Sequence, residues 1–361
     1  MKMKNLIKFR TLVLMLIVSS VMVLGSCKDD EEDPIVQGDY TALNALIVEA
    51  DALAAAATTA DYPEVAINAY KATLATVKTA AATPLTQVQI NNLVTQLTEA
   101  MTTFESQAYG FIDEALYLNA GWHFDEGTGT TATAFSTVKH VGTFKKGITK
   151  FGVPGTTMPA WVDGIKGGKA IKLNGGAHLE VPFTPAFLPA DITISVWVKL
   201  DSIYCDDYIV SQNYWQGYKF QTQCQAKSFF TFAKTDGGII DKDNALDNSA
   251  KVGMWSHLVV SLNSTTSTLK FYVNGTLVKT WTSTDGIGPL TRAPKNGPDG
   301  ALVAQNLPFL IGAAASDETI AGNNWTWAGQ MSFQGAMDEL KIYNIALADG
   351  QVTKLYNDEK P

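Results

Sequence analysis

The sequence is poor in cysteine, histidine and basic residues, and each shortage argues against a class of protein. It has 3 cysteines in 361 residues, too few for a disulfide-stapled scaffold or a four-cysteine zinc site. Its 4 histidines are never close in sequence, which argues against a histidine-rich metal centre. The 27 basic residues are outnumbered by 35 acidic ones, and this balance of -8 argues against nucleic acid as a partner.

The abundant residues indicate a globular, largely β-structured chain. Hydrophobic residues make up 46% and charged residues 17%, which is enough apolar material for a core. The 8 tryptophans and 29 glycines favour a loop-rich all-β body. The length allows two or three domains.

Residues 1–26 are predicted to be an export signal. Three lysines and one arginine precede an apolar run at residues 11–25, which is too short for a comfortable membrane span. The run ends in Leu24-Gly25-Ser26-Cys27, which resembles a bacterial lipobox. The resemblance implies that Cys27 becomes the first residue after cleavage and carries fatty-acid chains such as palmitate. The alternative is an ordinary secretory peptide that ends near a cysteine.

Residues 27–38 are predicted to be an acidic tether. Acidic residues fill positions 29–33, and such a like-charge run stays solvated. Cleavage after residue 26 would leave a formal charge of -12. The tether resembles the one that accompanies export of Bacteroidetes-type lipoproteins to the cell surface, and the alternative is a plain spacer. We therefore expect a protein that is lipid-anchored in the outer membrane and faces the cell exterior.

Residues 39–108 are predicted to form a three-helix bundle, because apolar residues recur there at helical spacing. Asp61-Tyr62-Pro63-Glu64 has the pattern of a helix start with Asp61 as N-cap, and Thr86 and Gln89 have the spacing of a capping box. The segment resembles the FIVAR-type three-helix modules of bacterial surface proteins. That resemblance implies a glycan- or partner-binding bundle, whereas the absence of a charge cluster or exposed aromatic set favours a spacer.

Residues 112–361 are predicted to form short antiparallel strands. Residues 192–198, 257–262 and 269–273 alternate between apolar and polar side chains, and Asn274-Gly275 is a strong hairpin signal. Many short strands with regular turns indicate a sandwich. The predicted fold class is therefore a small all-α three-helix bundle followed by an all-β antiparallel jelly-roll sandwich.

Five motifs follow one another in this region. They occupy residues 122–127, 167–175, 194–198, 255–275 and 335–347, and the last begins Gly-Ala-Met-Asp-Glu-Leu-Lys-Ile-Tyr-Asn. Their residues and order resemble the bacterial laminin G-like, concanavalin A-like lectin/glucanase family. We expect Trp197 and Trp255 to pack between the two sheets and His257 to be structural.

The same region lacks the carboxylates that hydrolysis would need. Glucanases of this fold place a Glu-x-Asp-x-x-Glu or similar cluster on an inner strand, and no Glu-x-Asp occurs in residues 112–361. No Gly-x-Ser-x-Gly occurs either, although spacing alone leaves a Ser-His-Asp triad open. The chain is therefore predicted not to be an enzyme.

Asp125 and Asp338 match the two acids of the family's motifs. The first and last strands of this fold run side by side, and the family often places calcium near that seam, so the resemblance implies calcium held by these carboxylates. The alternative is that both acids accept backbone hydrogen bonds. One departure is that residues 130–133, Thr-Thr-Ala-Thr, lack the aspartate that the family usually has there.

Cys205 and Cys224 are predicted to form a disulfide. They flank a predicted turn at residues 213–217, so they would face each other across a hairpin. Export would also place them where disulfides form. The alternative is two separately buried thiols.

Two aromatic clusters are candidate sugar-binding sites, because lectins combine aromatic platforms with amide groups. One is Asn213, Tyr214 and Trp215, in the turn between the two cysteines. The other is Asn324, Trp325 and Trp327, where alternate spacing puts both indoles on one side of an extended chain. The alternative is that the tryptophans cover the edge of the sandwich.

Together these features predict a cell-surface lipoprotein that captures extracellular carbohydrate without catalysis, serving an outer-membrane import complex. Its expected partners are a carbohydrate, the membrane through the lipid anchor and an outer-membrane transporter complex. One alternative is a protein-interaction or adhesion module docked on a transporter. Another is a glycoside hydrolase with an atypical site.

Overall fold

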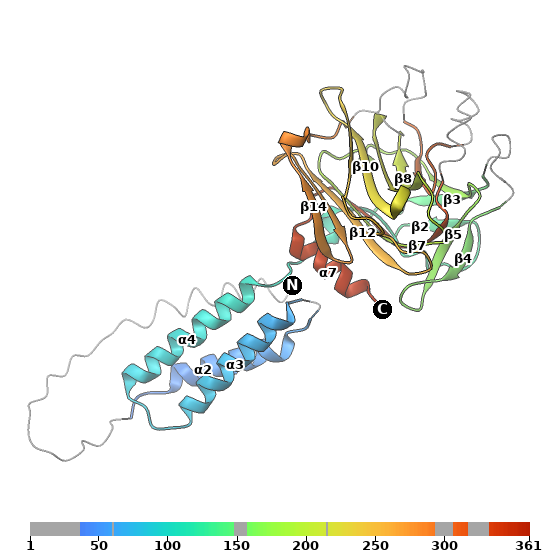
Figure 1. The fold of residues 1–361 in the computed structure, drawn as a ribbon. Helices are drawn as coiled ribbons and strands as arrows, with labels where there is room; N and C mark the ends of the chain where they lie inside the picture. Colours follow the sequence, from blue (N-terminus) through green and yellow to red (C-terminus); the bar gives the residue numbers. More distant parts are fainter. Residues whose placement is uncertain (1–36, 60, 148–156, 214–215, 293–305, 317–331) are drawn as a thin grey trace, which may run out of the picture.

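The computed structural model describes residues 37–59, 61–147, 157–213, 216–292, 306–316 and 332–361. Within these ranges three long helices precede two antiparallel β-sheets, as predicted, and a further helix follows the last strand (Figure 1). No helix of this described part is long and apolar enough to cross a membrane. The predicted signal peptide, most of the predicted tether and six candidate site residues lie outside the described residues, namely Cys27, Tyr214, Trp215, Asn324, Trp325 and Trp327.

The three N-terminal helices form a bundle around their own apolar core. They are α2 (Thr41–Ala56), α3 (Glu64–Ala81) and α4 (Gln87–Ser106). The side chains in its centre come from all three helices and include Leu43, Leu74 and Leu97. Tyr70 crosses between two helices, because its hydroxyl donates a hydrogen bond to the Ala50 carbonyl at 3.0 Å.

The two predicted helix starts have different outcomes. The capping box at α4 is confirmed, because Thr86 Oγ1 accepts from the Gln89 N–H and Gln89 Oε1 accepts from the Thr86 N–H. The prediction that Asp61 caps α3 is wrong, because the residue before the helix is Pro63. Asp61 instead accepts hydrogen bonds from Thr58 and from Lys354, which lies 293 residues away.

The two sheets stack as a sandwich. Sheet A has the order β14 (Thr276–Trp281), β13 (Thr268–Val273), β12 (Ser256–Asn263), β7 (Ile192–Leu200), β16 (Gly335–Tyr343), β5 (Lys169–Leu173) and β4 (Ala160–Asp163), and β1 (Leu118–Trp122) pairs with β16. Sheet B has the order β11 (Ile239–Asp243), β10 (Lys227–Ala233), β9 (Tyr218–Gln223), β8 (Asp207–Gln212), β15 (Phe309–Ile311), β6 (His178–Val181), β3 (Val141–Lys145) and β2 (Thr131–Thr133). The Asn274-Gly275 hairpin joins β13 to β14 as predicted, with both residues at positive φ.

The core lies between the inner faces of the two sheets. Sheet A contributes alternate residues such as Val196 and Val260, and sheet B contributes Phe220 and Phe230. The prediction that Trp197 packs in this core is wrong. Its ring instead lies against those of His257 and Tyr356 on the outer face of sheet A.

A helix that the sequence did not predict covers the outer face of sheet A. It is α7 (Asp349–Glu359), and Figure 1 shows it between the bundle and this sheet. Its Val352 and Leu355 join a second apolar cluster with Val259, Tyr272 and Tyr343 of the sheet. Both faces of β7 are therefore buried, which explains why its alternation did not reveal the side on which Trp197 lies.

Candidate functional site

The outer face of sheet B carries an unusual set of polar and aromatic side chains. Tyr218 and Phe220 of β9 point into the core, so alternation places Lys219 and Gln221 on the opposite, outer face. The same argument places Phe229 and Thr231 of β10 there, because Phe230 and Phe232 are core residues. Register then sets the neighbours, since Gln221 pairs with Tyr208 and Phe229, and Lys219 pairs with Thr231.

We call Tyr208, Lys219, Gln221, Phe229 and Thr231 the sheet-B cluster. Four of these side chains are buried, although a sheet's outer face usually meets water, and Phe229 is half-buried. The cluster combines two aromatic rings, a cation, an amide and a hydroxyl. Such a mixture is typical of ligand sites, in which a few placed polar groups sit among apolar surface.

Lys219 is the centre of the cluster. Its Nζ donates to the Tyr208 hydroxyl at 3.0 Å and lies 5.1 Å from the centre of that ring and 5.8 Å from the Phe229 ring. Burial lowers the pKa of Lys219 to about 8, against the opposing attraction of Asp241 and Asp206. The ammonium group therefore lies close to two aromatic rings.

Gln221 is held in place by a neighbouring acid. Its Nε2 donates to Asp206 Oδ1 at 2.8 Å. Its Oε1 is buried and accepts no hydrogen bond from the described residues. A buried amide oxygen that lacks a donor is costly, so this atom is a natural acceptor for a ligand hydroxyl or a bound water.

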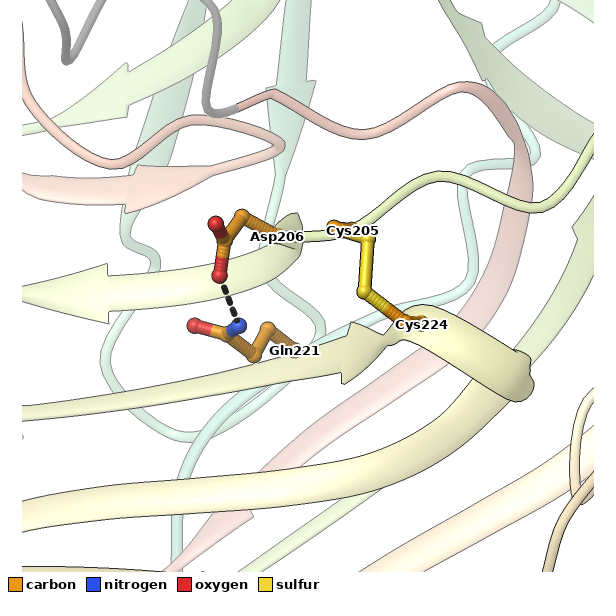
Figure 2. Close-up of a disulfide and its surroundings, with 4 residues drawn as sticks. All are labelled: Cys205, Asp206, Gln221 and Cys224. Carbon is orange, nitrogen blue, oxygen red and sulfur yellow. Dashed lines mark hydrogen bonds between the residues drawn. A yellow bond between two sulfur atoms is a disulfide. The ribbon is translucent and has the colours of Figure 1, made fainter.

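A disulfide fastens the two strands next to this acid–amide pair. Cys205 and Cys224 are bonded, with their Cα atoms 4.3 Å apart, and Figure 2 shows the bond beside the Asp206–Gln221 contact. The bond joins the residue two before β8 to the residue after β9. It therefore ties together the ends of the two strands that carry Tyr208, Lys219 and Gln221.

The predicted sugar-binding residue that the structure describes lies at the other end of these strands. Asn213 is in the β8–β9 turn, has a positive φ of 54° and is 3% exposed. Its carbonyl accepts from the Gln216 N–H at 3.1 Å, so its backbone closes the turn. Sequence reasoning thus selected this hairpin but did not identify the cluster on its face, and sugar binding by Asn213 stays a prediction. The available signal was the run Lys219 to Gln223, in which alternate residues are polar.

The two predicted calcium ligands lie at the seam where β1 pairs with β16. Asp125 Oδ1 accepts from the Lys169 N–H at 2.6 Å, and Asp338 Oδ2 accepts from the Ile165 N–H at 2.9 Å. Glycines make this approach possible, because a Cβ on Gly168 would lie 2.1 Å from Asp125 Oδ1, and one on Gly164 would lie 2.6 Å from Asp338 Oδ2. Both acids therefore bind the backbone of the turn at residues 164–169.

Charge repulsion remains at this seam. Burial, helped by the charges of Glu339 and Asp125 and opposed by two backbone hydrogen bonds, raises the pKa of Asp338 to about 7. Among the described residues, however, no three His, Cys, Asp or Glu side chains gather closely enough to hold a metal. These residues do not by themselves form a closed metal site, and calcium here stays a prediction.

A serine–histidine pair is present on sheet A, but it does not have the arrangement of a catalytic triad. Ser195 Oγ and His257 Nε2 are 2.8 Å apart, and both residues are fully buried. Burial lowers the pKa of His257 to about 3, so its ring is neutral. Glu359 approaches the same Nε2 at 3.9 Å and not the Nδ1 that the acid of a triad would hold. The pair is a buried contact between the paired strands β7 and β12.

Comparison with known proteins shows a similarity over part of the sandwich. Residues 173–299 match a family of laminin G type that is described as the concanavalin A-like lectin/glucanases superfamily. This range includes every residue of the sheet-B cluster. No curated protein matches the chain.

Three solved structures are similar to this chain over part of its length. Domain 4 of AbnA, a GH43 extracellular arabinanase from Geobacillus stearothermophilus in complex with arabinotriose, is 21% identical; the match covers 66% of this chain and 98% of that one, with a TM-score of 0.46. The binding domain of Paraclostridial Mosquitocidal Protein 1 is 16% identical, with 67% and 52% covered and a TM-score of 0.46. The binding domain of botulinum neurotoxin DC in complex with SialylT is 12% identical, with 67% and 51% covered and a TM-score of 0.43. The chain spans about half the length of these two toxin domains.

Proposed function

We propose that this lectin-like protein binds carbohydrate without catalysis, and that the sugar lies on the sheet-B cluster. The observation that carries the proposal is the buried grouping of Lys219 with two aromatic rings, next to the unsatisfied Oε1 of Gln221. Aromatic faces pack against the apolar faces of sugar rings, while amide and ammonium groups bond their hydroxyls. The carboxylates beside the cluster are already engaged, since Asp206 accepts from Gln221 and Asp241 accepts from Thr231.

The proposed setting is the outer surface of the outer membrane. Support comes from the lipobox-like Cys27, the acidic run after it and the helical bundle that precedes the sandwich. In this proposal Cys27 anchors the protein, and the sandwich captures a polysaccharide for an import complex with a transporter.

A glycan array tests the binding proposal. The chain from residue 27 onward, with Cys27→Ser to prevent lipidation, is applied beside Gln221→Ala and Lys219→Met. We expect signals on a limited set of polysaccharides that both variants lose at a temperature at which each variant is still folded, since truncation of these buried side chains also lowers stability. Absence of binding to every glycan contradicts the proposal. Release of reducing sugar from a bound glycan would instead favour the hydrolase alternative.

One observation favours a protein partner as the second candidate function. Four large apolar side chains near the end of β7 are exposed. Ile203 and Tyr204 follow the strand in sequence and are 47% and 51% exposed, and Val252 and Met254 are 48% and 59% exposed. Val252 is held beside Leu200 by a β-bridge. Exposed apolar groups of this kind often mark protein contacts. A transporter that co-purifies with the parent from outer membranes, but not with Tyr204→Ser/Met254→Ser, would support docking. A complex that persists in this double variant would contradict it.

A further inference from the structure

The C-terminal helix α7 contacts the N-terminal bundle directly. Lys354 Nζ lies 2.7 Å from Asp61 Oδ1, and Asn357 Nδ2 donates to the Thr59 carbonyl at 3.3 Å. The hydrogen bond from Lys354 is the largest cause that lowers the pKa of Asp61 below its ordinary value. The loop between α2 and α3 is therefore joined to a helix nearly 300 residues later in the chain.

The connection between bundle and sandwich is also held against α7. The Tyr109 N–H donates to the Asp61 carbonyl at 2.9 Å, and Gln351 Nε2 donates to the Phe111 carbonyl at 3.0 Å. Gly350 allows close approach, because a Cβ there would lie 2.6 Å from the Tyr109 carbonyl oxygen. Ile112 then enters the apolar cluster that contains Leu355. A linker with these contacts on both sides has little freedom to swing.

The opposite side of α7 is fixed to sheet A by apolar packing and by buried charge. Glu359 is 7% exposed, forms an ion pair with Lys341 and accepts from Trp197 Nε1 at 2.8 Å. Burial alone would lower the pKa of Lys341, but the carboxylates of Glu359 and Glu339 raise it above its ordinary value. At the other end of the helix, Asp349 accepts from Lys270 at 2.6 Å and from the Tyr272 hydroxyl at 2.9 Å.

We propose that α7 is a two-sided clamp that fixes the bundle to the outer face of sheet A in one orientation. Because the sheet-B cluster lies on the opposite outer face of the sandwich, the clamp turns that cluster away from the bundle (Figure 1). The bundle is then a rigid arm rather than a flexible spacer. The clamp stands on the contacts of α7 alone, and only the direction of the ligand face rests on the proposed function.

Distance measurement between spin labels tests the clamp. Labels are placed on Thr76→Cys in α3 and Thr235→Cys after β10, two exposed positions, in the chain from residue 27 with Cys27→Ser. Cys205 and Cys224 are bonded to each other and do not take a label. We expect a single narrow distance distribution for this parent. Lys354→Glu places two like charges in contact and should cause loss of that single peak.

Two further variants complete the test. The exchange Asp61→Lys/Lys354→Glu restores opposite charges and should restore the narrow distribution. Lys360→Ala is the matched control, because Lys360 lies at the end of the same helix and donates within it to Asn357 at 2.8 Å. A broad distribution in the parent, or a narrow one in Lys354→Glu, overturns the clamp. Glycan binding is measured in parallel and should be the same in all variants, so failure of the proposed function is seen separately.

Discussion

The indole Nε1 of Trp197 donates a hydrogen bond to Glu359 Oε2 at 2.8 Å, joining the central strand of sheet A to the last turn of α7. The other oxygen of Glu359 faces Lys341, which is 6% exposed. One carboxylate near the end of the chain therefore balances a buried ammonium group and satisfies a buried indole. This makes Glu359 a sharp test of how α7 is held.

Glu359→Ala should destabilise the protein, because it leaves the buried Lys341 with Glu339 as its remaining counter-charge and removes the acceptor of the buried Trp197 indole. Loss of one partner of a buried ion pair typically costs roughly 3–5 kcal/mol. Chemical denaturation measures the free energy of unfolding. The double variant Lys341→Met/Glu359→Leu removes both charges and should recover much of the loss, since apolar residues can replace such a pair. Equal stability of Glu359→Ala and the parent would contradict the buried pair.

The free energy of unfolding should depend on pH through Asp207. Burial, helped by the charges of Asp201 and Asp206 and opposed by a backbone hydrogen bond from Gln334, raises the pKa of this carboxyl from 3.8 to about 8. The folded state holds the proton more tightly than the unfolded state, so this stabilisation is present below pH 3.8 and is lost as pH rises through about 8. Asp207→Asn cannot titrate. The parent should therefore lose stability relative to this variant across that window, and parallel pH profiles would contradict the shift.

Removal of the disulfide should loosen the site as well as lower stability. In the loop-entropy model a crosslink over a loop of this length contributes about 3 kcal/mol. Cys205→Ser/Cys224→Ser should lower the unfolding temperature and also weaken glycan binding, because the bond lies beside the Asp206–Gln221 contact (Figure 2). Isothermal titration at a temperature at which the variant is folded separates the two effects. Unchanged affinity would show that the crosslink serves stability alone.

Phe229→Ala should weaken glycan binding, since an aromatic contact is worth about 0.5–1.5 kcal/mol, or up to about tenfold in affinity. Phe111→Ala is the matched control, because that ring is 71% exposed and remote from the cluster in sequence. Binding should also decline as pH rises past about 8, where Lys219 loses its proton. Titration of both variants over this range checks the two effects, and equal affinities for Phe229→Ala and the parent would remove Phe229 from the site.

The calcium prediction is tested at the seam between β1 and β16. A cation near Asp125 and Asp338 would relieve the repulsion that raises the pKa of Asp338. The unfolding temperature of the parent should then be higher with calcium than with a chelator. The unfolding temperature of Asp125→Asn/Asp338→Asn should be the same in both. The same unfolding temperature with and without calcium would leave the two acids as acceptors for the backbone N–H groups of Lys169 and Ile165.

The sequence by itself determined the features that depend on near neighbours. Helical spacing identified the bundle, the spacing of Thr86 and Gln89 identified a cap, and Asn274-Gly275 identified a hairpin. The hairpin between Cys205 and Cys224 was also predicted, because the two cysteines flank a single turn in the sequence. Each of these signals is local, so the chain alone carries it.

Only the tertiary structure decided which faces are covered and which distant groups meet. Alternation showed that Trp197 and Val198 point to opposite sides, but α7 buries the outer side as well, so apolar character did not distinguish core from outer face. Asp61 has the local pattern of an N-cap, yet its carboxylate accepts a hydrogen bond from Lys354, which lies 293 residues away. The sheet-B cluster likewise exists only because register places residues of three strands side by side. The local pattern determines which side chains share a face of a strand or helix, whereas tertiary packing determines what each face contacts.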